Sequence, residues 1–108
     1  MEVIMTKKNL RRAINHGFEV LRERGYFAEQ DWKCCQSCGC RAVPDEFEQH
    51  YVFYHWQDGA ILREAGWTRL AWAGDGHEIV DVFRAEGLRV EWNGSQNCRI
   101  LIGTPVLN

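Results

Sequence analysis

The stretch Asp75–Ile102, DGHEIVDVFRAEGLRVEWNGSQNCRILI, predicts a helix that leads into a β-hairpin. Asp75 and Glu78 have the spacing of a capping box, which marks a helix N-terminus. Gly87 supplies the left-handed residue with which many helices end. The apolar face of this helix is formed by Ile79, Val80, Val82 and Phe83.

The hairpin is predicted from the alternation of apolar and polar residues. Leu88, Val90 and Trp92 alternate with polar neighbours, as in a half-buried strand. Asn93-Gly94 is a strong turn signal. Beyond it, the residues Cys98, Ile100 and Ile102 alternate again. We therefore expect two antiparallel strands after the helix.

The N-terminal part of the chain predicts an amphipathic helix from a cap at Thr6 to about Arg24, ended by Gly25. One apolar stripe follows the helical period, formed by Leu10, Ala13, Ile14, Gly17, Phe18 and Leu21. The first turns are basic through Lys7, Lys8, Arg11 and Arg12. A solvated face explains these cations, and a docking face for an acidic partner is the alternative.

The middle of the chain predicts short strands around a loop. Residues 28–44 show no periodicity and are expected to form a cysteine-containing loop. Tyr51–Trp56 is rich in strand-forming residues, Asp58 is the expected cap of a short helix to Ala65, and Thr68–Ala73 reads as a further strand. We expect one α+β domain over residues 1–108, a two-layer sandwich with an antiparallel or mixed sheet of about four strands.

Composition excludes some classes of function. The chain has 108 residues and a net charge of −2, so it lacks the basic footprint of a dedicated nucleic-acid-binding protein. No apolar run approaches the roughly 20 residues that span a bilayer. The segment Met1–Met5 is too short and too acidic for a signal peptide, so we expect a cytoplasmic protein.

Four of the five cysteines lie between Cys34 and Cys40. The run Cys35-Gln36-Ser37-Cys38-Gly39 has the form of a zinc knuckle, in which two thiolates reach one ion at about 2.3 Å. Cys34 is set aside because a residue adjacent to a ligand seldom turns toward the same ion, and His50 is the best placed of the distant candidates. We expect one structural zinc, with Cys35, Cys38, Cys40 and His50 as ligands.

Two other interpretations of the cysteines remain open. A redox Cys-x-x-Cys pair normally sits at the N-terminus of a helix. Gly39–Pro44 is a poor helix start, which disfavours this interpretation. Free thiols that pack as small apolar groups are the other alternative.

The five tryptophans are many for a chain of this size. Burial of all five in the core is the simple explanation. Because tryptophan is enriched at the energetic centres of interfaces, we also consider exposed anchors. Trp67 is the first choice because it lies at a predicted helix-to-strand corner, and Trp32 in the cysteine loop is the second.

Three motifs together resemble a bacterial family of domains of unknown function, over roughly residues 10–102. They are CCQSCG at residues 34–39, YVFYHWQD at residues 51–58, and GLRVEWNG at residues 87–94 with Arg99-Ile100. The resemblance implies that the cysteine knuckle and the hairpin belong to one compact bacterial domain. Cys40 and Trp56 depart from the pattern, and the family carries no activity that could be transferred.

These observations predict a non-catalytic protein-binding module, of the kind that small bacterial or phage proteins use to inhibit or modulate a larger machine. The expected partner-binding residues are Lys7, Lys8, Arg11, Arg12, Trp32 and Trp67. A zinc-dependent enzyme with Glu48 as its base is one alternative. The other is a nucleic-acid-binding protein that uses the basic helix and exposed aromatic side chains.

Overall fold

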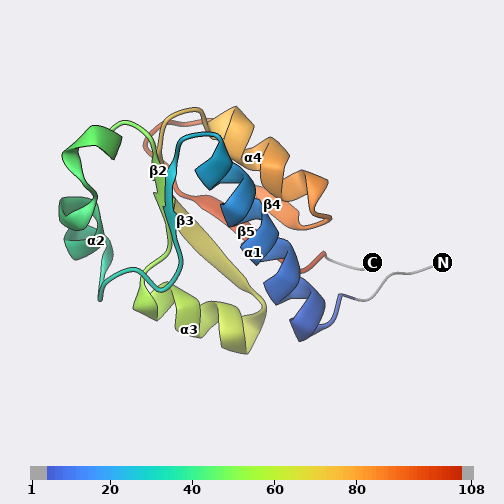
Figure 1. The fold of residues 1–108 in the computed structure, drawn as a ribbon. Coiled ribbons are helices and arrows are strands. Elements are labelled where there is room, and N and C mark those ends of the chain that lie inside the picture. Colours follow the sequence, from blue (N-terminus) through green and yellow to red (C-terminus); the bar gives the residue numbers. More distant parts are fainter. Residues whose placement is uncertain (1–4, 106–108) are drawn as a thin grey trace.

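The computed structural model describes residues 5–105 (Figure 1). Most of Met1–Met5, on which the signal-peptide expectation rests, lies outside this range. The elements are α1 (Lys7–Glu23), β1 (Phe27–Glu29), α2 (Gln36–Ala42), the 3-10 turn η1 (Asp45–Phe47), β2 (Tyr51–Phe53), α3 (Trp56–Ala65), β3 (Trp67–Ala73), α4 (Gly76–Ala85), β4 (Arg89–Glu91) and β5 (Ile100–Gly103). The predicted α+β class is confirmed. No helix among the described residues is long and apolar enough to cross a membrane.

The strands form one mixed sheet in the order β1-β2-β3-β5-β4. β1 and β2 are parallel, with Phe27 opposite Tyr51, and the other neighbouring pairs are antiparallel. The sheet has five strands rather than about four. The additional strand, β1, is only three residues long, so it shows no alternation that a sequence pattern could reveal.

One face of the sheet carries the main core, covered by α1 and α4 (Figure 1). The predicted stripe of α1 is buried, and Phe18 makes edge-to-face contacts with Tyr54 and Phe83 at centroid distances of 5.9 and 5.6 Å. Thr6 caps α1 by accepting a hydrogen bond from the N–H of Asn9. The side chain of Asp75 caps α4 in the same way. α1 and α4 therefore begin where the sequence predicts.

The opposite face of β1 and β2 is covered by α2 and η1, which lie across the sheet from α1 (Figure 1). A second core cluster there is centred on Val43, Phe53 and Ala71. A Cβ atom at Gly39 of α2 would lie only 2.5 Å from the ring of Phe53, so only glycine permits this approach. The expectation of an irregular loop over residues 28–44 was therefore wrong, because this segment contains α2 and the last two residues of β1.

The expected strand over Tyr51–Trp56 is divided between β2 and α3. His55, not Asp58, is the N-cap of α3, because its Nδ1 accepts a hydrogen bond from the N–H of Asp58 at 3.3 Å. The helix thus starts at Trp56, about one turn earlier than predicted. It ends at Gly66 with a positive φ of 80°, as expected.

The hairpin joins β4 to β5 with Val90 opposite Ile102, so residues 92–99 form the connection. Asn93-Gly94 is a local turn within this connection, since Oδ1 of Asn93 accepts a hydrogen bond from the N–H of Ser95. Trp92 donates from Nε1 to the carbonyl of Ser95, and Trp72 donates to that of Cys98. The hydrogen bonds of two indole rings therefore fix the connection between β4 and β5, which is longer than the two-residue turn that Asn93-Gly94 predicts.

The pair formed by His16 of α1 and Glu86 at the end of α4 predicts a pH dependence. Its atoms Nδ1 and Oε2 are 2.6 Å apart, and the hydrogen bond to Glu86 raises the pKa of His16 above its ordinary value. Because the pKa of His16 is raised in the folded state, the pair stabilises the fold fully at pH values below the unfolded-state pKa of this histidine. This contribution is lost as the pH rises through the folded-state pKa.

We expect Glu86→Gln to lower the pKa of His16 in an NMR titration, and the stability difference from the parent chain to shrink as the pH rises. Asp81→Asn removes a charge of the same sign from α4 and is the matched control. An unchanged His16 titration in Glu86→Gln would contradict the assignment.

Candidate functional site

Three cysteine sulfurs cluster at the start of α2. The Sγ atoms of Cys34, Cys35 and Cys38 all lie within 4.8 Å of one another, and those of Cys34 and Cys35 are 3.9 Å apart. Cys35 is the N-cap of α2, and Cys38 follows within its first turn. The cluster can therefore hold a metal ion.

The backbone before the cluster is held in an unusual conformation. Asp31 and Lys33 have positive φ angles of 51° and 62°, a region that non-glycine residues seldom adopt. Between them, the N–H of Trp32 donates to the carbonyl of Tyr54 at 2.9 Å. The carbonyl of Lys33 accepts from the N–H of Trp56 at 3.0 Å. These two bonds fix the position from which Cys34 and Cys35 project.

Hydrogen bonding makes the thiols unequal. The pKa of Cys35 is lowered, chiefly because the nearby backbone N–H of Cys38 favours the charged form of its sulfur. The pKa of Cys38 is raised, chiefly by the hydrogen bond that joins its thiol to Cys35. The cluster thus contains one thiol that ionises more readily than a free cysteine, beside one that ionises less readily.

The structure brings together Cys35 and Cys38 of the expected zinc ligands and places the other two elsewhere. The Sγ of Cys40 lies 3.6 Å from the hydroxyl of Tyr51, within the second core cluster. The ring of His50 stacks on Tyr26 at 3.6 Å, and its Nδ1 is 3.0 Å from the carbonyl of Gly25. Cys34, which the sequence analysis set aside, is the third member of the cluster.

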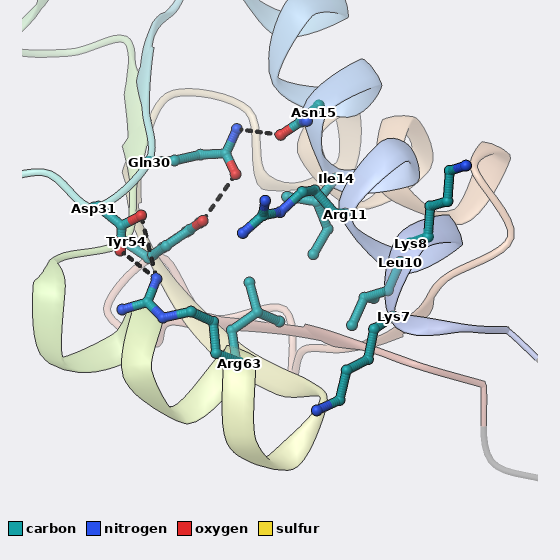
Figure 2. A pocket seen from close by; sticks show the side chains of 11 residues that line it. Lys7, Lys8, Leu10, Arg11, Ile14, Asn15, Gln30, Asp31, Tyr54 and Arg63 are labelled. Atoms are coloured by element: carbon teal, nitrogen blue, oxygen red, sulfur yellow. Dashed lines mark hydrogen bonds and ion pairs between the residues drawn. The ribbon is translucent and has the colours of Figure 1, made fainter.

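A groove with a volume of about 760 Å³ lies between α1 and α3 (Figure 2). We call it the cationic groove. Its lining is formed by Lys7, Lys8, Leu10, Arg11, Ile14, Asn15, Gln30, Asp31, Tyr54, Leu62 and Arg63. Three of the expected partner-binding residues, Lys7, Lys8 and Arg11, therefore lie in one concave surface. Arg12 is exposed but does not line it.

A chain of hydrogen bonds forms one wall of the cationic groove (Figure 2). The hydroxyl of Tyr54 donates to Oε1 of Gln30 at 2.8 Å, and Nε2 of Gln30 donates to Oδ1 of Asn15 at 2.9 Å. Burial raises the pKa of Tyr54, so this hydroxyl stays protonated and remains a donor. Since each of these groups has its partner, the wall is already formed before any ligand binds.

The positive charges of the groove differ in their partners. Arg63 forms an ion pair with Asp31 at 3.2 Å, and its guanidinium lies 5.6 Å from the centre of the Trp56 ring. Arg11 makes no ion pair within residues 5–105, and Figure 2 shows its guanidinium reaching into the groove opposite Arg63. This arrangement leaves Arg11 available to an anionic group.

The tryptophan with the most exposed side chain is Trp56, which the sequence analysis did not consider as an anchor. Trp56 is 62% exposed, whereas Trp32 and Trp67 are half-buried. Trp32 packs in the second core cluster and donates from Nε1 to the carbonyl of Gly39 at 3.1 Å. The sequence pattern assigned Trp56 to a strand. The histidine that precedes it could have signalled a helix start, but histidine is not among the preferred cap residues.

A buried carboxylate, that of Asp58, lies in the first turn of α3. Asp58 is 4% exposed, and its Oδ2 is 2.7 Å from the guanidinium of Arg99 and 3.0 Å from Nε2 of His55. Because Nδ1 of His55 accepts the N–H of Asp58, its other ring nitrogen is the donor to the carboxylate. The group ties the start of α3 to the residue before β5, and we assign it a structural role.

Comparison with known proteins gives a family and no activity. A family model described as "Domain of unknown function (DUF6891)" matches residues 10–106. The resemblance to an uncharacterised domain family is thereby confirmed. No curated protein and no solved structure matches the chain significantly. The matched range contains the thiol cluster and most of the cationic groove.

Removal of the buried carboxylate tests the structural role of Asp58. We expect Asp58→Ala to lower the free energy of unfolding by about 3 kcal/mol, because it leaves Arg99 and His55 without their partner. Arg24→Ala breaks an exposed pair with Glu78 and should cost less than about 1 kcal/mol. Urea unfolding measures both variants. If both variants lowered the free energy of unfolding equally, the buried pairs of Asp58 would be no stronger than an exposed ion pair, which would contradict the structural role.

Proposed function

We propose that this chain, which belongs to the family of domains of unknown function DUF6891, is a non-catalytic protein-binding module. The observation that supports the proposal is the cationic groove between α1 and α3. In this proposal the protein acts in a bacterial cytoplasm, where it inhibits or modulates a larger bacterial or phage assembly.

The chemistry of the groove favours an acidic segment of a partner protein. Lys7, Lys8, Arg11 and Arg63 provide four positive charges, against the single negative charge of Asp31. Leu62 is partly buried and supplies apolar surface in the same groove, whose floor is formed by the buried Leu10 and Ile14. A segment that carries carboxylates beside an apolar side chain satisfies both features.

Trp56 extends this surface toward the thiol cluster. Its ring contacts the guanidinium of Arg63, which also pairs with Asp31 in the groove. An exposed tryptophan held next to an arginine is typical of interface centres. Trp32 and Trp67 remain proposed secondary contacts outside the groove, whereas Arg12 does not line it and is left out of the proposed surface.

Two alternatives have weaker support. A nucleic-acid-binding protein needs a larger excess of basic residues than a chain of net charge −2 supplies. A zinc-dependent enzyme needs a general base near the metal. Within residues 5–105, the close metal-binding group consists of cysteines alone.

Charge reversal on α1 tests the groove, with adjacent arginines as variant and control. We expect Arg11→Glu to weaken the binding of a labelled peptide of alternating glutamate and leucine at least about tenfold. The loss of a charge-assisted hydrogen bond, roughly 1.5–3 kcal/mol, gives this magnitude. Arg12→Glu makes the same charge change outside the groove and should alter affinity less than about threefold. Fluorescence anisotropy measures both.

A peptide with lysine in place of glutamate is the control for charge and should not bind. Equal weakening by Arg11→Glu and Arg12→Glu would mean that net charge alone attracts the peptide. Binding of the lysine peptide would contradict recognition of an acidic partner.

As a cofactor of this module, we propose one structural zinc held by Cys34, Cys35 and Cys38. A tetrahedral ion with Zn–S distances of 2.3 Å separates its sulfurs by about 3.8 Å. The Sγ atoms of Cys34 and Cys35 are already 3.9 Å apart. Three thiolates fill three of the four tetrahedral positions, and a fourth ligand would complete a structural site. The metal would link the segment before α2 to the first turn of that helix.

Metal analysis separates this ligand set from the one expected from sequence. Protein purified without chelator should contain about one zinc per chain, and serine at residue 34, 35 or 38 should abolish it. Cys40→Ser and His50→Ala should retain the metal, with Cys98→Ser as the control. Zinc loss in Cys40→Ser or His50→Ala would restore the sequence-based set. Metal-free parent protein would refute the zinc site.

A further inference from the structure

Cys35 and Cys38 meet a geometric condition that the sequence did not reveal. The N–H of Gly39 donates to the carbonyl of Cys35 at 2.9 Å, so the Cys-x-x-Cys run opens helix α2. Residues three apart lie on the same side of a helical turn. The sequence-based argument against a redox pair, that no helix starts here, therefore does not hold.

We propose that Cys35 and Cys38 form a reversible dithiol–disulfide pair that reacts with low-molecular-weight disulfides. The sulfurs are within 4.8 Å of each other, and side-chain rotation can close this gap to the bond length of about 2.05 Å. Cys34 is exposed, and Cys35 and Cys38 are partly exposed, so a small disulfide can reach the cluster.

The other cysteines are less suitable partners. A bond between Cys34 and Cys35 would close an eight-membered ring between adjacent residues, which strains the peptide and the disulfide dihedral angle. Cys40 is turned toward the hydroxyl of Tyr51 on the core side. Cys98 lies in the connection before β5, where Nδ2 of Asn93 is 3.4 Å from its sulfur.

The exchange balances in two steps. A thiolate of the pair attacks one sulfur of the small disulfide, which breaks the S–S bond, forms a mixed disulfide and releases one small thiolate. The second cysteine, as a thiolate, then attacks the sulfur of the first and releases the other small thiolate. Two electrons pass from the cysteine pair to the small disulfide, and the two protons of the pair go to solvent or to the released thiolates.

The oxidised pair has no thiolates left for a metal ion, so the disulfide and the metal-bound form exclude each other. The proposal does not rest on the zinc site, because the pair reacts in metal-free protein. A failure of the zinc prediction would therefore leave it intact.

The test uses chelator-treated full chain in buffers of reduced and oxidised glutathione. We expect a product lighter by two hydrogens, a Cys35–Cys38 bond in peptide mapping, and full reversal by excess reduced glutathione. A variant with serine at residues 34, 40 and 98 should behave in the same way. Cys38→Ser should instead accumulate a mixed disulfide with glutathione at Cys35.

The matched control keeps only Cys40 and Cys98, with serine at residues 34, 35 and 38, and should form no internal disulfide. Three results would overturn the proposal. They are glutathione addition without internal bonding in the parent chain, mapping of the bond to Cys34, and equal oxidation in the control variant. Mapping in the parent chain decides the question even if a variant folds poorly.

Discussion

Two backbone hydrogen bonds, from Trp32 to Tyr54 and from Trp56 to Lys33, fix the segment on which both candidate sites depend. The first bond joins the two segments that follow the paired residues of β1 and β2. The second joins the segment to the start of α3. Such bonds offset the strain of the positive φ angles at Asp31 and Lys33, because backbone in this conformation persists only where surrounding contacts hold it.

The same segment contributes to two different surfaces. Gln30 and Asp31 line the cationic groove, and Cys34 and Cys35 belong to the thiol cluster, only a few residues further along the chain. Helix α3 also contacts this segment, because Arg63 forms an ion pair with Asp31. The guanidinium of Arg63 lies over the ring of Trp56 in the same helix. A metal ion or a disulfide in the cluster would therefore restrain the backbone that also shapes the groove.

The sequence predicted α1 and α4 well because caps and helical stripes are local signals. It failed for β1 and α2, since each is short and depends on contacts made elsewhere in the chain, such as Gly39 against Phe53. The zinc ligands expected from the sequence were only partly brought together by the structure, for the same reason. Spacing alone could identify Cys35 and Cys38, whereas the stacking of His50 on Tyr26 and the contact of Cys40 with Tyr51 are tertiary events. The groove joins residues of α1 and α3 and has no signature in either segment alone.

The distribution of charge has a kinetic consequence. The groove lining carries three more positive than negative charges, so the rest of the chain must carry five more negative than positive charges to give the net −2. The groove therefore carries a local excess of positive charge, although the chain as a whole is acidic. An anionic partner that approaches the groove is attracted and oriented before contact. This attraction acts on encounter rather than on residence, so added salt should slow association while leaving dissociation nearly unchanged.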